Sequence, residues 1–204
     1  MIIKGKRWMV FVFCSLFISG GTLYGAMKHI YWTDQVGDGI YRATTAGAGA
    51  TEIIDRVNPI SVIVNPNLNK VYWTEGPDSP TPLYEASLTG LTPSVLSNNN
   101  ASLTTGVPSL GYNTSTNRLY YGSWRRMNFI DSDGSNYTQA SRGTQYNNGV
   151  SVDAVNSNIY YIRSGDIYCA NLDLTGEISI STTTTGLASM TLDAASGKMY
   201  YSST

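Results

Sequence analysis

The sequence is poor in the residues that build metal and catalytic centres. It contains one histidine, His29, and two cysteines. A single histidine excludes the His–His and His–Cys ligand sets of zinc sites, and a serine triad would depend on His29 alone. No Gly-rich phosphate loop of the usual pattern is present. We therefore interpret His29 as a strand-edge residue and predict a non-enzymatic protein without metal or cofactor.

Charged side chains are scarce and balanced in sign. They make up 13% of the 204 residues, with 13 lysines and arginines against 14 acidic residues and a formal net charge of −1. No basic patch stands out, so phosphate-driven binding of nucleic acid has no support. Tyrosine is common, and Gly, Asn, Ser and Thr fill the spaces between apolar runs. This composition is typical of a β-rich soluble domain rather than of a disordered chain.

Long hydrophobic runs are absent except near the N-terminus. Basic residues within the first seven positions precede an apolar run over residues 8–18, which small residues follow. This order is typical of a secretory signal peptide, here assigned to residues 1–26, and the run is short for a membrane span. Cleavage after Gly21 and cleavage after Ala26 both fit the pattern. The alternative is an uncleaved membrane anchor, and that is the only route to a membrane.

A leader of this kind places the rest of the chain outside the cytoplasm, as a secreted, extracellular or periplasmic protein. Cys14 lies in the apolar run and leaves with it, so Cys169 has no partner for a disulfide within the mature chain. We predict that Cys169 is a small buried hydrophobic side chain rather than a reactive thiol.

An aromatic pair recurs along the rest of the chain. The first aromatic residues of successive pairs are 41, 48, 40 and 40 residues apart. A period near 40 with several short strands per unit is the sequence signature of a β-propeller. The pairs and the residues that extend the first two are Tyr31, Trp32, Thr33 and Asp34; Tyr72, Trp73, Thr74 and Glu75; Tyr120 and Tyr121; Tyr160 and Tyr161; Tyr200 and Tyr201.

A polar residue precedes most of these pairs by seven positions and opens a four-residue turn. Asn or Asp at such a place can accept hydrogen bonds from backbone amides just ahead, and apolar runs on both sides make a hairpin. We predict these residues to be turn caps rather than a ring of ligands around an axis. They are Asn65, Asn113, Asp153 and Asp193.

A third strand and a weaker fourth strand complete each unit. Residues 39–43, 82–86, 127–130 and 166–170 occupy equivalent third-strand places, and a turn that ends in glycine follows each of them. Four antiparallel strands in about 40 residues form one propeller blade. The predicted fold is therefore all-β, a propeller over residues 28–204. Its units run over residues 28–58, 59–105, 106–146, 147–183 and, in part, 184–204.

The aromatic pair has a predicted packing role. Successive strand residues point to opposite faces of a sheet, so one ring fills the gap to one neighbouring blade and the next ring fills the other gap. A carboxylate after the pair, as at Asp34, lies where the strand ends and can accept turn amides.

The motif at residues 30–34, Ile-Tyr-Trp-Thr-Asp, resembles the YWTD repeats of the low-density lipoprotein receptor family. Residues 71–75 match with Glu for Asp, and residues 129–136 look like the family's third strand and Asp-Gly turn. The later motifs keep only the aromatic pair. The resemblance implies a non-catalytic module that presents propeller loops to a protein or peptide ligand.

The number of blades departs from the family, which usually closes a ring of six. The sequence holds three complete units, a first unit that starts at its second strand and a last one that stops after its second strand, so about 4–5 blades are present. A fragment of a longer protein, a small closed ring and an arc completed by a second chain all fit. An open arc exposes edge strands and favours self-association.

One loop between a second and a third strand is a candidate contact site. It places Trp124 beside Arg125 and Arg126, and Arg163 takes a similar position one unit later. Trp and Arg are enriched at binding hot spots, and functional residues concentrate on scaffolded loops. In the alternative interpretation, which assigns no function to the loop, Trp124 packs on a neighbouring blade and the arginines are solvated.

Two other functions stay open besides protein binding. Exposed Tyr and Trp rings also suit a carbohydrate or cell-envelope binder, and hydrolase or lactonase propellers use a metal held by scattered acidic residues. Asp131 to Gly134 only faintly resembles a calcium loop and reads as a tight turn. Asn100, Asn113 and Asn136 stand in glycosylation sequons.

Overall fold

The structure is a computed structural model that describes residues 10–12, 29–76, 82–97, 109–180 and 186–203. Every element assigned in these ranges is a strand. The first eight are β1 (Val10–Val12), β2 (His29–Asp34), β3 (Gly39–Thr44), β4 (Thr51–Asp55), β5 (Pro59–Asn65), β6 (Lys70–Glu75), β7 (Leu83–Ser87) and β8 (Ser94–Ser97). The others are β9 (Leu110–Asn113), β10 (Arg118–Asp131), β11 (Thr138–Asp153), β12 (Asn158–Arg163), β13 (Asp166–Asn171), β14 (Ile178–Ser179), β15 (Leu187–Asp193) and β16 (Lys198–Ser203).

The first eight strands form two antiparallel sheets of four strands each. Their orders are β1-β2-β3-β4, called blade A, and β5-β6-β7-β8, called blade B. In each sheet the strands follow one another along the chain, so each neighbour is reached through a short turn. β1 lies within the predicted signal peptide and pairs with β2, with Phe11 opposite Trp32 in the register. The remaining residues of that predicted leader, Cys14 among them, and the sequon at Asn100 lie outside the described residues.

A six-stranded sheet, β14-β13-β12-β11-β10-β9, holds the next two blades. β10 folds back on itself near Arg125 and forms a hairpin. Its two ends therefore meet, and Arg118 forms an ion pair with Asp131. Its first arm pairs with β9 and its second arm with the start of β11. These strands form blade C. The end of β11 pairs with β12 and, with β13 and β14, forms blade D.

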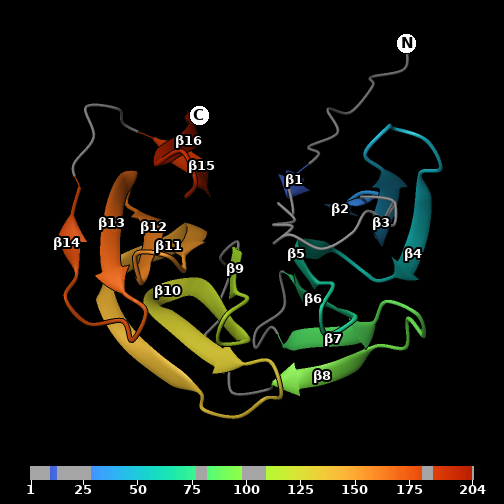
Figure 1. Ribbon diagram of the computed structural model, residues 1–204, viewed down its shortest axis with the longest axis horizontal. Helices are drawn as coiled ribbons and strands as arrows, with labels where there is room; N and C mark the ends of the chain where they lie inside the picture. Colours follow the sequence, from blue (N-terminus) through green and yellow to red (C-terminus); the bar gives the residue numbers. More distant parts are fainter. Residues whose placement is uncertain (1–9, 13–28, 77–81, 98–108, 181–185, 204) are drawn as a thin grey trace.

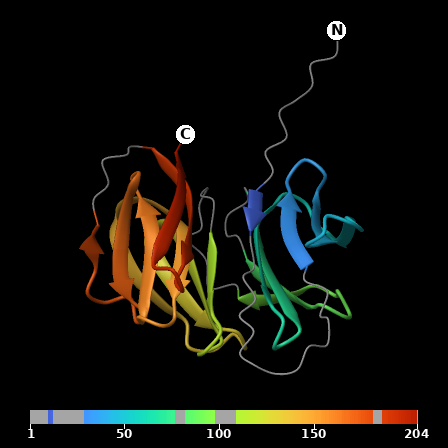
Figure 2. The ribbon, with the colours of Figure 1, turned by 45° about the horizontal axis from the view of Figure 1, so that its top comes forward.

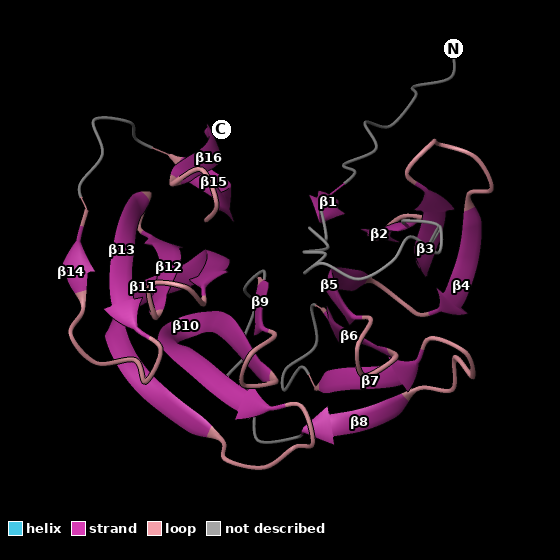
Figure 3. Ribbon diagram, in the orientation of Figure 1, coloured by secondary structure: helices cyan, strands magenta, loops and turns pink. Residues whose placement is uncertain are grey.

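The last strands, β15 and β16, form a two-stranded sheet, called blade E. The five blades follow one another around an arc whose two ends face each other across a gap (Figure 1). The turned view shows the sheets standing side by side around that arc (Figure 2). This is an open β-propeller, and the predicted all-β fold is confirmed; the colouring by secondary structure shows strands and loops only (Figure 3).

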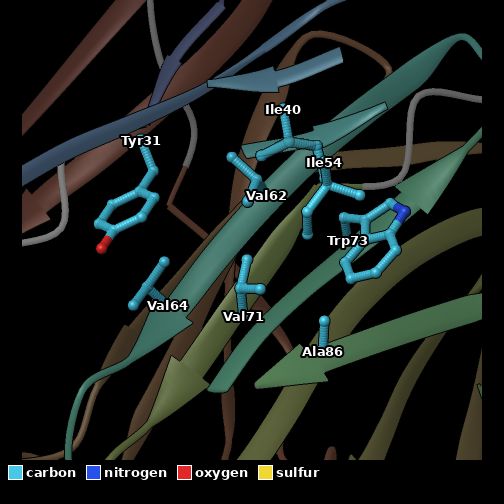
Figure 4. Close-up of a cluster of buried hydrophobic side chains, with 8 residues drawn as sticks. All are labelled: Tyr31, Ile40, Ile54, Val62, Val64, Val71, Trp73 and Ala86. Atoms are coloured by element: carbon cyan, nitrogen blue, oxygen red, sulfur yellow. The ribbon is translucent and has the colours of Figure 1, made fainter. Parts of the chain in front are cut away.

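Alternating aromatic rings pack the blades together. Between blades A and B, Tyr31 and Trp73 flank a group of aliphatic side chains that includes Val62 and Val71 (Figure 4). Tyr72, the neighbour of Trp73 in the chain, instead lies in the core between blades B and C, with Leu119 and Tyr121. Because adjacent strand residues face opposite sides, one pair serves two interfaces, as the sequence predicts.

The same alternation continues further along the chain. Tyr120 and Tyr161 share the core between blades C and D, and Tyr160 packs against the cluster between blades D and E. Burial is complete in the middle of the arc, where the exposed fraction is 0% for Tyr72 and Tyr161 and 1% for Tyr120. The interfaces therefore depend on large rings, whose burial stabilises most per residue.

The rings of the last aromatic pair are not covered as those in the middle of the arc are. Tyr200 and Tyr201 are 55% and 50% exposed. β16 pairs only with β15, and no described strand follows it, so neither ring has the neighbours that cover its equivalents. Trp32, on the opposite end, is partly exposed and stacks on Tyr41 of its own blade.

Serine side chains tie the innermost strands to one another. Ser61 accepts a hydrogen bond from the amide of Leu110 at 3.3 Å, and Ser109 accepts one from the amide of Val150 at 3.0 Å. Ser151 repeats the contact with the amide of Leu192 at 3.1 Å. These bonds fix the innermost strands against each other, so the loops at the ends of the blades are held in a constant frame.

Candidate functional site

The predicted contact loop is the tip of the hairpin that the two arms of β10 form. Ser123 Oγ donates to the carbonyl of Arg126 at 3.4 Å across this tip. Arg125 has a φ of 64° and therefore lies in the left-handed region, which costs an ordinary L-residue on the order of 1–2 kcal/mol. Strained backbone of this kind concentrates at functional sites. We call residues 123–126 the β10 tip.

A buried polar network holds the β10 tip in place. Asn147 Nδ2 donates to the carbonyls of Ser123 at 3.0 Å and of Arg126 at 3.4 Å. Asn128 Nδ2 donates to Ser123 Oγ at 3.2 Å, and Tyr137 donates to Asn128 Oδ1 at 3.1 Å. Asn147, Asn128 and Ser123 are all buried. Since buried polar groups keep their partners, the network fixes the loop before any ligand arrives.

Close packing next to the β10 tip reinforces this rigidity. A Cβ on Gly122 would clash with the backbone carbonyl oxygen of Asn147, so only glycine fits here. Burial raises the pKa of Tyr121 and of Tyr137, so both phenols remain neutral hydrogen-bond donors at physiological pH.

The network leaves the outer side chains of the tip at the surface. Arg125 is exposed, whereas Trp124 and Arg126 are partly exposed. The guanidinium of Arg125 lies 5.4 Å from the ring centre of Trp124, within cation–π range. Arg126 donates to Gln139 Oε1 at 2.7 Å. The structure therefore brings together Trp124, Arg125 and Arg126 as a cationic and aromatic surface on a rigid loop.

Arg163 does not join this surface as a free cation. Its guanidinium donates to both carboxylate oxygens of Glu177, at 2.9 and 3.0 Å, and lies 3.7 Å from the ring centre of Tyr168. A bidentate pair over an aromatic ring uses most of the donors of an arginine. Arg163 thus stabilises blade D, and β11 separates it from Trp124 in the strand order.

The pair between Arg163 and Glu177 is one of several ion pairs that the sequence alone did not predict. Glu177 also forms an ion pair with Arg142, in the first part of β11, at 2.7 Å. Burial raises the pKa of Glu177, while the charge of Arg142 opposes that effect. Between blades A and B, Arg56 pairs with Glu75, which accepts a hydrogen bond from Trp73 Nε1 at 2.8 Å. Both clusters join strand ends that lie far apart in the sequence, so no local pattern reveals them.

The predicted turn residues all accept amide hydrogen bonds. Asn65 Oδ1 accepts from Asn67 at 3.0 Å, and Asn113 Oδ1 accepts from Ser115 at 2.9 Å. Asp153 and Asp193 accept in the same way, from Asn156 at 3.0 Å and from Ser196 at 3.2 Å. Asp34 likewise accepts from two amides of its own turn. His29 opens β2, and its ring lies 6.2 Å from that of Tyr31.

The opposite face of the propeller carries a polar cavity of about 450 Å³ between the turns of blades B and C. Lys70, Asp131 and Ser132 line it, with Asn117 from the neighbouring turn. Arg118 lies 2.7 Å from Asp131. Burial alone would raise the pKa of the Asp131 carboxyl, but the hydrogen bonds from Arg118 and Asn136 outweigh burial and lower this pKa. Within the described ranges, no three His, Cys, Asp or Glu side chains could hold a metal ion together.

No described helix is long and apolar enough to cross a membrane. Cys169 is buried, and burial raises the pKa of its thiol, so the thiolate is disfavoured.

Comparison with solved structures agrees with the fold. The chain is similar to a protein in the crystal structure of a nidogen/laminin complex, with a TM-score of 0.64 and 21% identity over 74% of this chain. It is also similar to a gluconolactonase from Xanthomonas campestris, with a TM-score of 0.71 and 13% identity over 87% of this chain. A putative TolB from Agrobacterium tumefaciens gives a TM-score of 0.62 and 10% identity over 75%.

These likenesses show a β-propeller and leave the function open, because their identities are low and the three proteins differ in what they do. The chain spans 58%, 66% and 61% of the nidogen/laminin, gluconolactonase and TolB chains, respectively. No protein-family model and no curated protein match the sequence.

Proposed function

We propose that this protein is a secreted, non-catalytic binding module of the YWTD-repeat type, and that the β10 tip contacts an acidic segment of a protein or peptide. The similarity to a chain of the nidogen/laminin complex supports a role in protein binding. The repeated aromatic pairs support the resemblance to the receptor repeats. The N-terminal pattern supports export.

The observation that carries the proposal is the conformation of Arg125. The structure holds an exposed arginine in left-handed backbone geometry beside a tryptophan, on a loop that buried amides fix. At the corresponding tips of blades A and D the left-handed residues are Asp38, Ser164 and Gly165, which are small or tolerate this conformation. A long cation at such a place costs stability and is expected where it recognises a ligand.

A capture experiment tests the proposal. The purified chain is immobilised and offered the proteins of the source organism's surface fraction, and the captured proteins are identified. We expect Trp124→Ala and Arg125→Ala each to lower capture by at least about tenfold, as for hot-spot residues. Ser164→Ala serves as the matched control, because it changes a left-handed tip residue of blade D and leaves the β10 tip intact.

Salt dependence separates specific contact from general stickiness. Capture through two arginines should weaken as ionic strength rises from 50 to about 500 mM, because exposed charges are screened. If both β10 tip variants, folded by circular dichroism, capture the same proteins as the unchanged chain, the proposed surface is rejected.

A carbohydrate ligand is the second candidate, and the exposed Tyr200 and Tyr201 favour it, since sugars stack on aromatic rings. Glycan binding that survives loss of Trp124 and fails on loss of these tyrosines would support it. For a hydrolase, similarity to the gluconolactonase is the only support, and no metal-binding group of acids lies within the described residues.

A further inference from the structure

In blade C, a polar residue takes a place that leucine holds in blades B and D. The residue that follows the third strand donates its amide to the carbonyl that ends the first turn of the same blade, at 2.8 Å from Leu88, 2.8 Å from Ser132 and 3.2 Å from Leu172. Leu88 packs against the core between blades A and B, and Leu172 packs against the core between blades C and D. The equivalent Ser132 is buried as well. The end of the core between blades B and C is therefore polar where the other two are apolar.

Phenol hydroxyls lie behind Ser132. The hydroxyl of Tyr72 is buried and makes no hydrogen bond of good geometry within the described residues. Burial raises the pKa of Tyr72 and of Tyr112, and Ser132 lies close enough to offset part of both effects. Since buried hydroxyls normally keep a partner, this group of hydroxyls favours a polar occupant over an apolar one.

The polar cavity between the turns of blades B and C lies over Ser132, and we call it the B–C cavity. Lys70 lines it from blade B and Asp133 from blade C. Lys70 Nζ lies 2.6 Å from Glu85, which uses one of three N–H donors. Asp133 Oδ1 accepts from the amide of Ser135 at 2.9 Å, and its second carboxylate oxygen can accept from a ligand. Bonds from Ser135 lower the pKa of Asp133, and the charge of Lys70 adds to this effect.

These charges favour a neutral ligand with several hydroxyls. A carboxylate placed on Lys70 would meet Glu85, and an ammonium placed on Asp133 would meet Lys70. A hydroxyl both donates and accepts, so two neighbouring hydroxyls of one ligand can accept from Lys70 and donate to Asp133. Ser132 offers a further hydroxyl on the floor, and Leu68, 41% exposed, offers an apolar wall for C–H groups.

We propose that the B–C cavity binds a sugar ring through two neighbouring hydroxyls, with Lys70 as donor and Asp133 as acceptor. Its volume of about 450 Å³ lies in the range of small-molecule sites. The cavity is on the face opposite the β10 tip, and neither Tyr200 nor Tyr201 lines it. The sugar site therefore succeeds or fails independently of the proposed protein-binding surface.

A titration with simple sugars tests the site. The probes are the methyl glycosides of glucose, galactose and mannose, added separately to the isotope-labelled 204-residue chain, and amide chemical shifts are followed by NMR. We expect at least one of them to shift the amides of Asn117 and Ser132 in a saturable way. Glycine, which carries both charges and no hydroxyl, should leave these amides unchanged.

A disaccharide then distinguishes two sources of the ligand. The sugar that binds is offered as the terminal unit of a disaccharide. Retained affinity supports recognition of a glycan end, and lost affinity supports recognition of a free sugar.

Two matched substitutions locate the site. Asp133→Asn keeps the oxygen that closes the turn and removes the charged acceptor, so it should weaken the sugar at least about tenfold. Asp173→Asn is the control, because Asp173 accepts from the amide of Thr175 at 2.9 Å in the same turn of blade D, where Leu172 takes the place of Ser132. The control should bind the sugar as the unchanged chain does.

Ser132→Leu tests the comparison between blades directly. It copies Leu88 and Leu172, fills the floor of the B–C cavity and should abolish sugar binding. Circular dichroism checks that this variant folds, and Asp133→Asn provides the test if it does not.

Three results would overturn the proposal. The first is that none of the three glycosides shifts the amides around the cavity. The second is a sugar affinity that Asp133→Asn and Asp173→Asn change equally, or that a folded Ser132→Leu retains. The third is binding of glycine without binding of a sugar, which would assign the cavity to a zwitterion.

Discussion

Arg125 is the residue at which the proposed recognition opposes stability. Its φ of 64° strains a residue that has a Cβ atom, whereas glycine adopts this conformation without strain. The surrounding amides of Asn147 and Asn128 hold the turn closed, so the strain is retained in the free protein. At the residue scale, function and stability should therefore separate cleanly.

We predict that Arg125→Gly raises the free energy of unfolding by about 0.5–1 kcal/mol and abolishes capture of the ligand. Urea denaturation followed by intrinsic fluorescence measures the first effect. Ser164→Gly, at a φ of 55° in blade D, should give a similar stabilisation with capture unchanged. A destabilised Arg125→Gly protein would contradict the strain argument.

Tyr72 shows the electrostatic consequence of burial at the residue scale. Burial raises the pKa of its phenol to about 12, and the ring stacks on Tyr112 with centres 6.2 Å apart. The folded state therefore disfavours the phenolate, and this contribution is present below pH 10 and is lost as the pH rises through about 12. Absorbance titration near 295 nm should show a tyrosine step close to pH 12.

The conservative change Tyr72→Phe keeps the ring and removes the ionisable group. We expect this variant to lack the step near pH 12 and to resist alkaline unfolding better than the unchanged chain. An unchanged alkaline midpoint would show that other buried tyrosines, such as Tyr121, control the transition.

At the element scale, the hairpin between the first and second strands is the repeating unit of the fold. Each turn is closed by one Asn or Asp and ends in a residue with left-handed backbone, namely Asn69, Asn117, Ser157 or Gly197. The carbonyls of the first three accept amides that follow the third strand, from Leu88, Ser132 and Leu172. One turn therefore orders three strands.

At Asp153, the contribution of the oxygen acceptor to the turn can be separated from that of the negative charge. Asp153 is buried and accepts amides from Val155 at 3.1 Å and Asn156 at 3.0 Å. We predict that Asp153→Ala lowers the free energy of unfolding by about 1–2 kcal/mol, because two turn amides lose their acceptor. Asp153→Asn, which copies Asn65 and Asn113, should cost less than about 0.5 kcal/mol in the same urea titration.

Equal costs for the two substitutions would mean that the charge of Asp153, rather than its oxygen acceptor, closes the turn. The bond from Asn156 Nδ2 to the second carboxylate oxygen at 2.8 Å is the contact that would then matter.

These elements also mark how far the sequence alone reaches. Local signals predicted the hairpins, the third strands and the alternation of the rings, because each depends on residues a few positions apart. Contacts between blades, such as Arg56 with Glu75, depend on how sheets meet in space and carry no local signature. For the same reason the sequence alone places Arg163 with the contact loop, although in the structure its guanidinium is bound to Glu177.

At the scale of the whole molecule, the arc is a series of similar interfaces with two open ends. The rings in its middle are buried on both sides, and the rings at its C-terminal end are half exposed. Stability should therefore depend on the position of an aromatic residue along the arc and not on its type. Since every unit supplies a tyrosine at the same place, the chain provides its own controls.

The sharpest comparison is between Tyr120 and Tyr200, which hold the same position in blades C and E. Tyr120 packs between blades C and D and donates to the carbonyl of Leu172 at 2.9 Å. We predict that Tyr120→Ala lowers the free energy of unfolding by about 3–5 kcal/mol, whereas Tyr200→Ala changes it by less than about 0.5 kcal/mol. Tyr120→Phe, which loses only the hydrogen bond, should cost about 1 kcal/mol. Urea titrations of the three variants measure these differences, and a loss at Tyr200 as large as that at Tyr120 would mean that blade E is covered in solution by a further sheet.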